Sequence, residues 1–410
     1  MRVQRCKGTR DLAPEEMARF RLIEGVFRDR CLKWGYEEVR TPTLEYLYLF
    51  TATGTLTPSM LGKVYSFLDW DGWSGERVVL RPDGTIPVAR FYIDNMVEGG
   101  SAKLFYVTNV FIFEPTGKET REKWQCGAEL IGVSSPSADV ELITLAFEVL
   151  TGLGLDGIRL RLSHAGLIRA LLAGLGLSPA EQNRVFDQIL DGDGDVLAKV
   201  KPARPQASKA LASLITSKGK SSGFLKTLKA QFGQDIPELK APLDAFIDTV
   251  SLLDTLGYDY EIDISSGRGF EYYTGIIFQL LTDEEKIGGG GRYDALIPLV
   301  GGRDVPASGF ALYLDPLMKA VRPAALGKPG AQRLLVRAEP EMVTEGFAIV
   351  KRLHQAGYSA ELYLAGRDVA GFRWALDVRS KAPPFLLTDR VKRRKVEAQT
   401  IDDVLALLNR

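Results

Sequence analysis

The stretch FIFEPTGKETREKWQCGAELIG, residues 111–132, places a polar loop between two segments in which apolar and polar residues alternate. Alternation with a period of two is typical of half-buried strands, so the stretch predicts a β-hairpin. On the first strand Ile112 and Glu114 share one face. On the second strand, Gln125 and Glu129 share one face. Either these polar faces meet water, or they coincide and form a site with two carboxylates, an amide and no neighbouring cation.

Strand patterns also dominate on both sides of the hairpin. They are expected within residues 63–72, 76–81, 157–164, 260–281, 286–297 and 307–321. Helices are expected at 15–35 and 137–154, where apolar residues recur with a helical period. Strands and helices do not alternate regularly, as they would in a βαβ protein. The sequence therefore favours an antiparallel-rich sheet of the α+β class, flanked by helices.

Composition changes mark two further parts of the chain. Residues from about 175 to 250 are helical and enriched in Lys, Ser and Ala, which indicates a helical insertion. The Pro/Gly-rich segment RPAALGKPGAQ, residues 322–332, predicts a linker. Beyond it, strand and helix patterns alternate as in a small α/β domain. We therefore expect a core domain over residues 1–325 and a second domain over 331–410.

The insertion has an unbalanced charge. Between Val196 and Gly233 the sequence has eight Lys or Arg residues and no acidic one. Such a run is either a solvated helical face or a surface that contacts phosphates or an acidic partner. The local sequence leaves both interpretations open.

The overall composition excludes several classes of protein. Lys plus Arg and Asp plus Glu both number 52 in 410 residues, so net charge gives no global argument for a nucleic acid or a membrane. The three cysteines are scattered, and no His lies at metal-ligand spacing, so no metal site is expected. No apolar run reaches the ~20 residues of a membrane span, and the N-terminus lacks an apolar signal core. We expect a cytoplasmic protein that contacts no membrane.

Four polar clusters lie at predicted strand ends or turns. The first is LRPDGT, residues 80–85, and the second is the hairpin. The third, GRGFEYYTG at 267–275, has glycines in a strand region, which often mark close approach by a ligand or another chain. The fourth, GGGGRYD at 288–294, lets the backbone lie against a ligand. It lacks the Lys-Ser/Thr of a P-loop and is therefore a weak phosphate motif.

Taken in order, these clusters resemble the catalytic core of histidyl-tRNA synthetase and its class II aminoacyl-tRNA synthetase relatives. KGTRDLAP at 7–14 resembles the N-terminal signature of that family, TPTLEY at 41–46 the end of motif 1, and the hairpin motif 2. RGFEYYTG and GGGGRYD resemble the two histidine-specific motifs, and GFALYLDPL at 309–317 resembles motif 3. The resemblance covers most of residues 5–320. It implies a class II synthetase-like antiparallel sheet that dimerises through motif 1, and the C-terminal part resembles a shortened anticodon-binding domain.

The resemblance also implies a histidine site. The residues that it assigns to histidine binding are Asp83, Gln125, Glu129, Arg268, Tyr272 and Tyr273. The first three would hold the α-ammonium, for which charge-assisted acceptors are suited. The two tyrosines would line the imidazole pocket. Arg268 would lie near the substrate carboxylate and the reacting phosphate.

The sequence departs from the family where an active enzyme grips ATP. Ile112 occupies the position of the motif 2 arginine, and Pro316 that of the motif 3 arginine. Loss of one preorganised donor typically lowers the rate about 100- to 1,000-fold. Asp315 and Pro316 also make a good N-cap and first-turn pair for a helix, which explains why proline is tolerated there. With Glu114 and Arg121 retained, these positions would form a vestigial ATP site without a catalytic residue or a cofactor.

An amino-acid site kept beside a dismantled triphosphate site is the pattern of a non-catalytic paralogue. The chain resembles the regulatory subunit of ATP phosphoribosyltransferase, which implies L-histidine and a short-form catalytic subunit as partners. We expect a homodimer within a hetero-oligomer. The alternative is an active histidyl-tRNA synthetase that binds tRNA, and another paralogue role also stays open. The segment RVKRRKV at 390–396 is either a tRNA contact or the charged turn of a hairpin.

Overall fold

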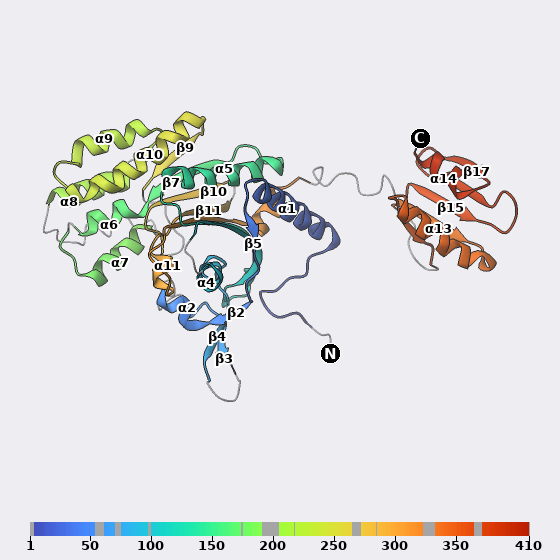
Figure 1. Ribbon diagram of the computed structural model, residues 1–410, viewed down its shortest axis with the longest axis horizontal. Coiled ribbons are helices and arrows are strands. Elements are labelled where there is room, and N and C mark those ends of the chain that lie inside the picture. Colours follow the sequence, from blue (N-terminus) through green and yellow to red (C-terminus); the bar gives the residue numbers. More distant parts are fainter. Residues whose placement is uncertain are drawn as a thin grey trace. The chain divides into compact units, whose positions relative to one another are not determined.

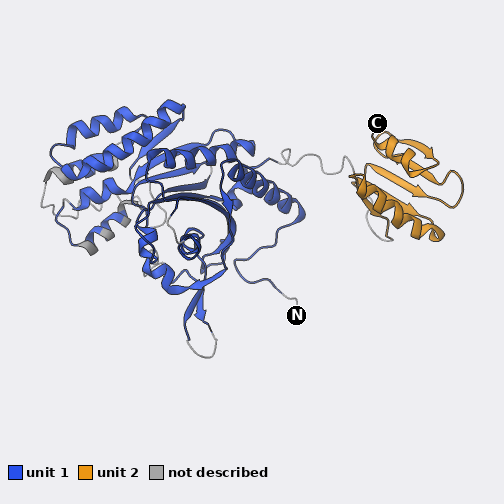
Figure 2. Cartoon of the chain, in the orientation of Figure 1, with its two compact units in different colours: residues 1–325 blue, residues 326–410 orange. Residues whose placement is uncertain are grey.

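The computed structural model describes residues 4–53, 61–69, 75–96, 100–173, 175–190, 205–216, 218–264, 272–283, 285–322, 333–364 and 371–409. The chain divides into two compact units, residues 1–325 and 326–410 (Figure 2). Within the described ranges no helix is both long and apolar enough to cross a membrane.

The first unit is built on a nine-stranded sheet (Figure 1). Its strands, in spatial order, are β1 (Glu37–Glu38), β5 (Ala102–Phe111), β6 (Glu122–Ile131), β12 (Ala307–Tyr313), β11 (Lys286–Arg292), β10 (Ile276–Leu281), β7 (Arg159–His164), β9 (Tyr260–Asp263) and β8 (Lys218–Gly219). Neighbouring strands run antiparallel except in the pairs β1–β5 and β7–β9. This sheet and the helices that flank it confirm the predicted α+β class.

The hairpin predicted from residues 111–132 is the pair β5–β6. Its register sets Leu104 opposite Glu129 and Thr108 opposite Gln125. From Gln125 onward every residue of β6 is buried, so this polar face does not meet water. Glu114 lies beyond the end of β5, where it accepts hydrogen bonds from backbone N–H groups of its own loop. The two carboxylates therefore do not share a site, because the hairpin loop begins before Glu114.

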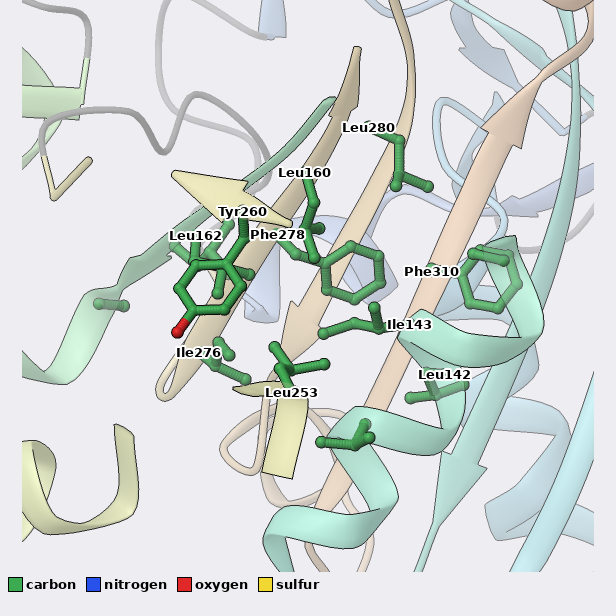
Figure 3. Packing of buried hydrophobic residues seen from close by; sticks show 14 of the residues in the cluster. Leu142, Ile143, Leu160, Leu162, Leu253, Tyr260, Ile276, Phe278, Leu280 and Phe310 are labelled. Carbon is green, nitrogen blue, oxygen red and sulfur yellow. The ribbon is translucent and has the colours of Figure 1, made fainter. Parts of the chain in front are cut away.

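Helices cover both faces of the sheet. On one face lie α1 (Pro14–Lys33), α5 (Pro136–Gly152), α10 (Lys240–Leu256) and α12 (Leu314–Ala320). Figure 3 shows how Ile143 of α5 packs against Phe278 of β10, with Leu253 of α10 nearby. On the other face lie α2 (Leu47–Ala52), α4 (Thr85–Asn95) and α11 (Leu296–Leu299). The second face matters for function, because it includes the buried side of β6 that carries Glu129.

The helical insertion expected at about 175–250 corresponds to a group of helices beside β7 and β9 (Figure 1). Its elements and the helix before it are α6 (Ala165–Ala173), α7 (Pro179–Leu190), α8 (Pro205–Thr216), α9 (Ser222–Phe232), η2 (Pro237–Leu239) and α10. Within the basic run, Lys218 pairs with Glu261 and Asp263 at 3.1 and 3.2 Å, and Lys229 pairs with Asp244. These two charges are thus used within the fold, while residues 191–204 lie outside the described part of the chain.

A three-stranded sheet is attached to the α4 side of the first unit. Its strands, in order, are β2 (Leu44–Tyr46), β4 (Arg77–Leu80) and β3 (Ser66–Leu68). Tyr48 of α2 is 63% exposed and stacks on Tyr46, with ring centroids 5.4 Å apart. This part of the molecule therefore presents aromatic side chains to solvent.

The second unit is a small α/β fold with its own core. Its five-stranded sheet has the order β14 (Ser359–Leu362), β13 (Arg333–Ala338), β15 (Trp374–Val378), β16 (Phe385–Asp389) and β17 (Arg394–Ala398). The helices are η4 (Pro340–Met342), α13 (Val343–Gln355) and α14 (Ile401–Leu408). The basic segment 390–396 forms the β16–β17 turn, where Asp389 accepts hydrogen bonds from two backbone N–H groups at 2.9 Å. Of the two interpretations, the hairpin turn is confirmed.

Candidate functional site

The turn LRPDGT delivers Asp83 to the start of α4. Arg81 fixes the turn, because its guanidinium donates to the backbone carbonyls of Asn109, Thr41 and Pro42 at 2.8 Å each. The Asp83 carboxylate accepts a hydrogen bond from the backbone N–H of Ile86 at 2.8 Å, as an N-terminal cap does. Its side chain is buried, and burial raises its pKa to about 6.

Glu129 forms a second buried acid on β6. It accepts hydrogen bonds from the hydroxyl of Tyr106, at 3.2 Å, and from that of Tyr293. Gln125 in turn donates to the Tyr106 hydroxyl at 3.3 Å. Burial raises the pKa of Glu129 to about 8, so this carboxyl is mostly protonated at neutral pH. Two acids whose charged forms are disfavoured by burial are suited to receive a cation.

Glycine makes room for this acid on the next strand. Gly309 lies directly opposite Glu129 in the β6–β12 pair, and a Cβ there would overlap the carboxylate. Gly127 plays the same part for Tyr106, because a Cβ on Gly127 would overlap the phenol ring. The glycines of this sheet therefore keep space for buried polar side chains.

Aromatic rings close the site. Tyr272 lies edge-on to Tyr293, with ring centroids 5.4 Å apart, and 5.2 Å from Tyr273. A cavity of about 30 Å³ is lined by both tyrosines of the pair, together with Asp83 and Gln125. This volume suits a single water molecule. Of the predicted histidine-binding residues, four line this small cavity: Asp83, Gln125, Tyr272 and Tyr273. Glu129 does not line it but accepts a hydrogen bond from Tyr293, which does. Arg268 lies outside the described residues.

The run GGGGRYD forms β11 and the turn after it. Gly289 and Gly290 line the cavity, as expected for a backbone that lies against a ligand. Arg292 does not point to a phosphate site, since it forms a buried ion pair with Asp139 at 2.8 Å. Its role is structural: it ties β11 to the first turn of α5.

A second cavity of about 710 Å³ adjoins the first and shares Gln125, Lys286 and Tyr313 with it. Ile112 and Pro316 both line it, so the two substituted positions meet there. The volume lies in the usual range for small-molecule sites. Pro316 lies in the first turn of α12 and follows Asp315, as the sequence predicts, although the N-cap residue is Tyr313.

The other two positions assigned to a vestigial ATP site lie apart from this cavity. Arg121 donates from Nε to the Glu114 carbonyl at 2.8 Å, and its guanidinium stacks over Phe113 at 4.6 Å. Glu114 is held by its own loop. Neither residue is among those that line the cavity. Among the described residues no group of three or more potential metal ligands occurs.

Three side chains of the site were not among the predicted site residues. Tyr106 and Tyr293 bind the Glu129 carboxylate, and Lys286 lines both cavities. Tyr293 belongs to a motif quoted above, and Tyr106 sits on the same face of β5 as Thr108. A period-2 reading of the first strand could have found Tyr106. No local pattern singles out Lys286.

The fold and the order of these motifs define a class II aminoacyl-tRNA synthetase-like protein. The histidyl-tRNA synthetase family model matches residues 8–317, and the chain belongs to this family. Among curated relatives, the ATP phosphoribosyltransferase regulatory subunits of Dehalococcoides mccartyi strains BAV1 and CBDB1 are 50% identical over 407 residues, which cover 99% of this chain and 98% of theirs. The histidine–tRNA ligase of Methanosarcina acetivorans is 35% identical, over 86% of this chain and 83% of its own.

Solved structures agree on the fold. The ATP phosphoribosyltransferase regulatory subunit/histidyl-tRNA synthetase from Bacillus halodurans matches with a TM-score of 0.78 at 23% identity, over 91% of this chain and 97% of its own. The apo histidyl-tRNA synthetase of S. aureus matches with a TM-score of 0.71 at 21% identity, over the whole of both chains. The predicted class II synthetase-like fold is confirmed.

Proposed function

We propose that this chain is the regulatory subunit of ATP phosphoribosyltransferase, which binds histidine and does not activate it. Curated relatives with that name share half of its residues over nearly its whole length. Relatives named histidine–tRNA ligase share about a third. The difference favours the regulatory role over the synthetase.

One observation carries the proposal within the site itself. Ile112 and Pro316 line the cavity next to Gln125, at the two positions where the family places phosphate-binding arginines. An aliphatic chain and a pyrrolidine ring offer no hydrogen-bond donor to a developing phosphate charge. The amino-acid half of the site keeps its buried acids. Such a site is suited to recognition of an amino acid without adenylate formation.

The small volume of the first cavity suggests how histidine binding leads to regulation. About 30 Å³ admits a water molecule and not an amino acid, so histidine needs a wider form of the site. A ligand that binds one form of a protein shifts the population towards that form. In our proposal this shift changes how the subunit packs against a short-form phosphoribosyltransferase. The coupling is reciprocal, so the partner also changes the affinity for histidine.

We also propose that the functional assembly is cytoplasmic and contains a homodimer of this chain. The exposed, stacked Tyr46 and Tyr48 lie at the end of the motif 1 segment, through which the family dimerises. Contiguous exposed aromatic groups often mark an interaction surface. We assign residues 1–325 to the synthetase-like core and 331–410 to an anticodon-binding-like domain.

The proposal is tested with the purified chain and a short-form phosphoribosyltransferase from the same genome. We expect the two to co-purify, and the chain to raise the activity of its partner in a histidine-sensitive manner. Calorimetric titration with histidine tests the ligand separately. No complex, or no binding at millimolar histidine, would contradict the corresponding half of the proposal. tRNA binding that falls steeply with salt would favour a nucleic-acid-binding paralogue instead.

A further inference from the structure

The larger cavity, of about 710 Å³, has a largely apolar lining. Pro82, Val110 and Pro316 line it and are themselves buried. Ile112 and Trp124 line it as well and are half-buried, so part of their apolar surface still meets water. Covering such surface with another apolar group is favourable, because it removes both surfaces from water. The lining therefore favours an occupant that is at least partly apolar.

The charges around this cavity do not suit a polyphosphate. Lys319 pairs with Glu285 at 3.0 Å, and Lys123 pairs with Glu119 at 3.6 Å, so both lysines have acidic partners that line the same cavity. Asp315 adds a third carboxylate to the lining. Carboxylates close to a bound phosphate would repel it. The cavity thus differs from a triphosphate site in its charges as well as in Ile112 and Pro316.

An apolar lining within a charged rim is instead the usual make-up of a protein interface. The rim lies on the surface, since Lys118 and Glu119 of the hairpin loop are exposed and Lys319 of α12 is 69% exposed. The Lys118 ammonium forms no ion pair with any residue that the structure describes. Its charge is therefore complementary to an acidic side chain on a partner that covers the cavity.

The larger cavity also has a direct connection to the proposed histidine site. Gln125 and Tyr313 line both cavities. A group that enters the larger cavity therefore contacts side chains that also line the smaller one. Two ligands that share such residues change each other's affinity whenever binding of one of them moves these side chains.

We propose that the larger cavity is a docking pocket for the short-form phosphoribosyltransferase. It receives an aliphatic or aromatic side chain of that partner, and an acidic side chain of the same segment pairs with Lys118. The inference rests on the proposed function and adds to it the surface through which the partner binds. Apolar side chains that fill a pocket on the other protein often supply much of the binding energy of an interface.

The test measures the affinity between the full chain and a short-form phosphoribosyltransferase from the same genome by calorimetry. Ile112→Asp should weaken this association about 30-fold or more, the usual effect of changing an interface hot spot, because the new carboxylate would be buried under the apolar side chain. Ile112→Leu keeps an apolar side chain of the same volume and should retain most of the affinity. Thermal melts establish that both variants are folded.

A second variant tests the charge at the rim. Lys118→Glu changes an exposed side chain, so it should leave the fold intact. It should weaken the association about 2- to 5-fold and reduce its dependence on salt. Leu256→Asp is the matched control, because Leu256 ends α10, is 58% exposed and does not line the cavity. This variant should bind the partner as the unmodified chain does.

Three outcomes would overturn the inference. If folded Ile112→Asp binds the partner as tightly as the unmodified chain, the cavity is not the docking pocket, while the proposed function stands. If the unmodified chain binds ATP, and Ile112→Asp loses ATP but keeps the partner, the cavity is a nucleotide site. If the unmodified chain does not associate with the phosphoribosyltransferase at all, the proposed function fails and the inference fails with it.

Discussion

Histidine binding should release protons, because both acids of the site are held partly or mostly protonated before the ligand arrives. The pKa of Glu129 is about 8 and that of Asp83 about 6. At pH 7 a group with a pKa of 8 is about 90% protonated, and one with a pKa of 6 about 10%. If the ammonium needs both carboxylates ionised, each histidine bound at pH 7 releases about one proton.

The same values set the pH dependence of the affinity. At pH 7 only about a tenth of the chains have Glu129 ionised, so binding should be about 10-fold weaker than with full ionisation, or ~1.4 kcal/mol. At pH 6 the Asp83 carboxyl is also half protonated, so the affinity for histidine is weaker still. The affinity should therefore rise steadily from pH 6 to pH 8.

Stability without ligand should follow the opposite trend. The folded pKa of Glu129 lies above the unfolded value of 4.5, so the folded chain holds a proton that the unfolded chain has lost. This contribution is fully present below pH 4.5 and is lost as the pH rises through 8. Histidine should offset that loss, because it supplies the missing positive charge.

The assay is calorimetry in several buffers whose ionisation enthalpies differ, since the slope of the observed enthalpy against buffer enthalpy counts the protons. Glu129→Gln should reduce the proton release at pH 7 to about a tenth of a proton, and should flatten the affinity above pH 7. Glu119→Gln, at the rim of the larger cavity, is the control and should change neither. Histidine binding with no buffer dependence and no change of affinity between pH 6 and 8 would refute this reasoning.

Four further substitutions test the fold. His164 is buried, and burial lowers its pKa to about 4. The free energy of unfolding should therefore fall by ~3 kcal/mol as the pH drops from 6.5 through 4. In thermal melts, the His164→Phe variant should lose this sensitivity to acid. Gly309→Ala should abolish histidine binding in the same calorimetric assay and lower stability by about 1–3 kcal/mol, because its Cβ overlaps a buried carboxylate. Gly25→Ala in α1, where a Cβ meets nothing, should raise stability by about 0.5–1 kcal/mol. Arg292→Met should cost about 3–5 kcal/mol in denaturant unfolding, and adding Asp139→Asn should recover part of the loss.

Local patterns predicted much of this molecule. The period-2 alternation around residues 111–132 predicted the hairpin, and the resemblance of the motifs predicted that Asp83 and Gln125 lie in one site, as the cavity that both line confirms. The meeting of Ile112 and Pro316 in one cavity also followed from the family positions. These features depend on local sequence or on motif order, both of which are visible without coordinates.

What could not be predicted depends on pairing between distant strands. The register that sets Gly309 opposite Glu129 joins residues far apart in the chain, and it decides which side chains have room. The same holds for Lys286, whose place at the junction of two cavities comes from the arrangement of β11 beside β12. The buried ion pair between Arg292 and Asp139 also joins distant segments, so the local sequence GGGGRYD does not show that this guanidinium is used within the fold.

The central claim is that this chain recognises histidine without activating it, and histidine-dependent ATP–pyrophosphate exchange tests that claim most directly. The purified full-length chain should show no exchange above background at saturating histidine, because Ile112 and Pro316 supply no donor to the phosphates. Strong exchange under the same conditions would contradict the account and identify the chain as an active synthetase.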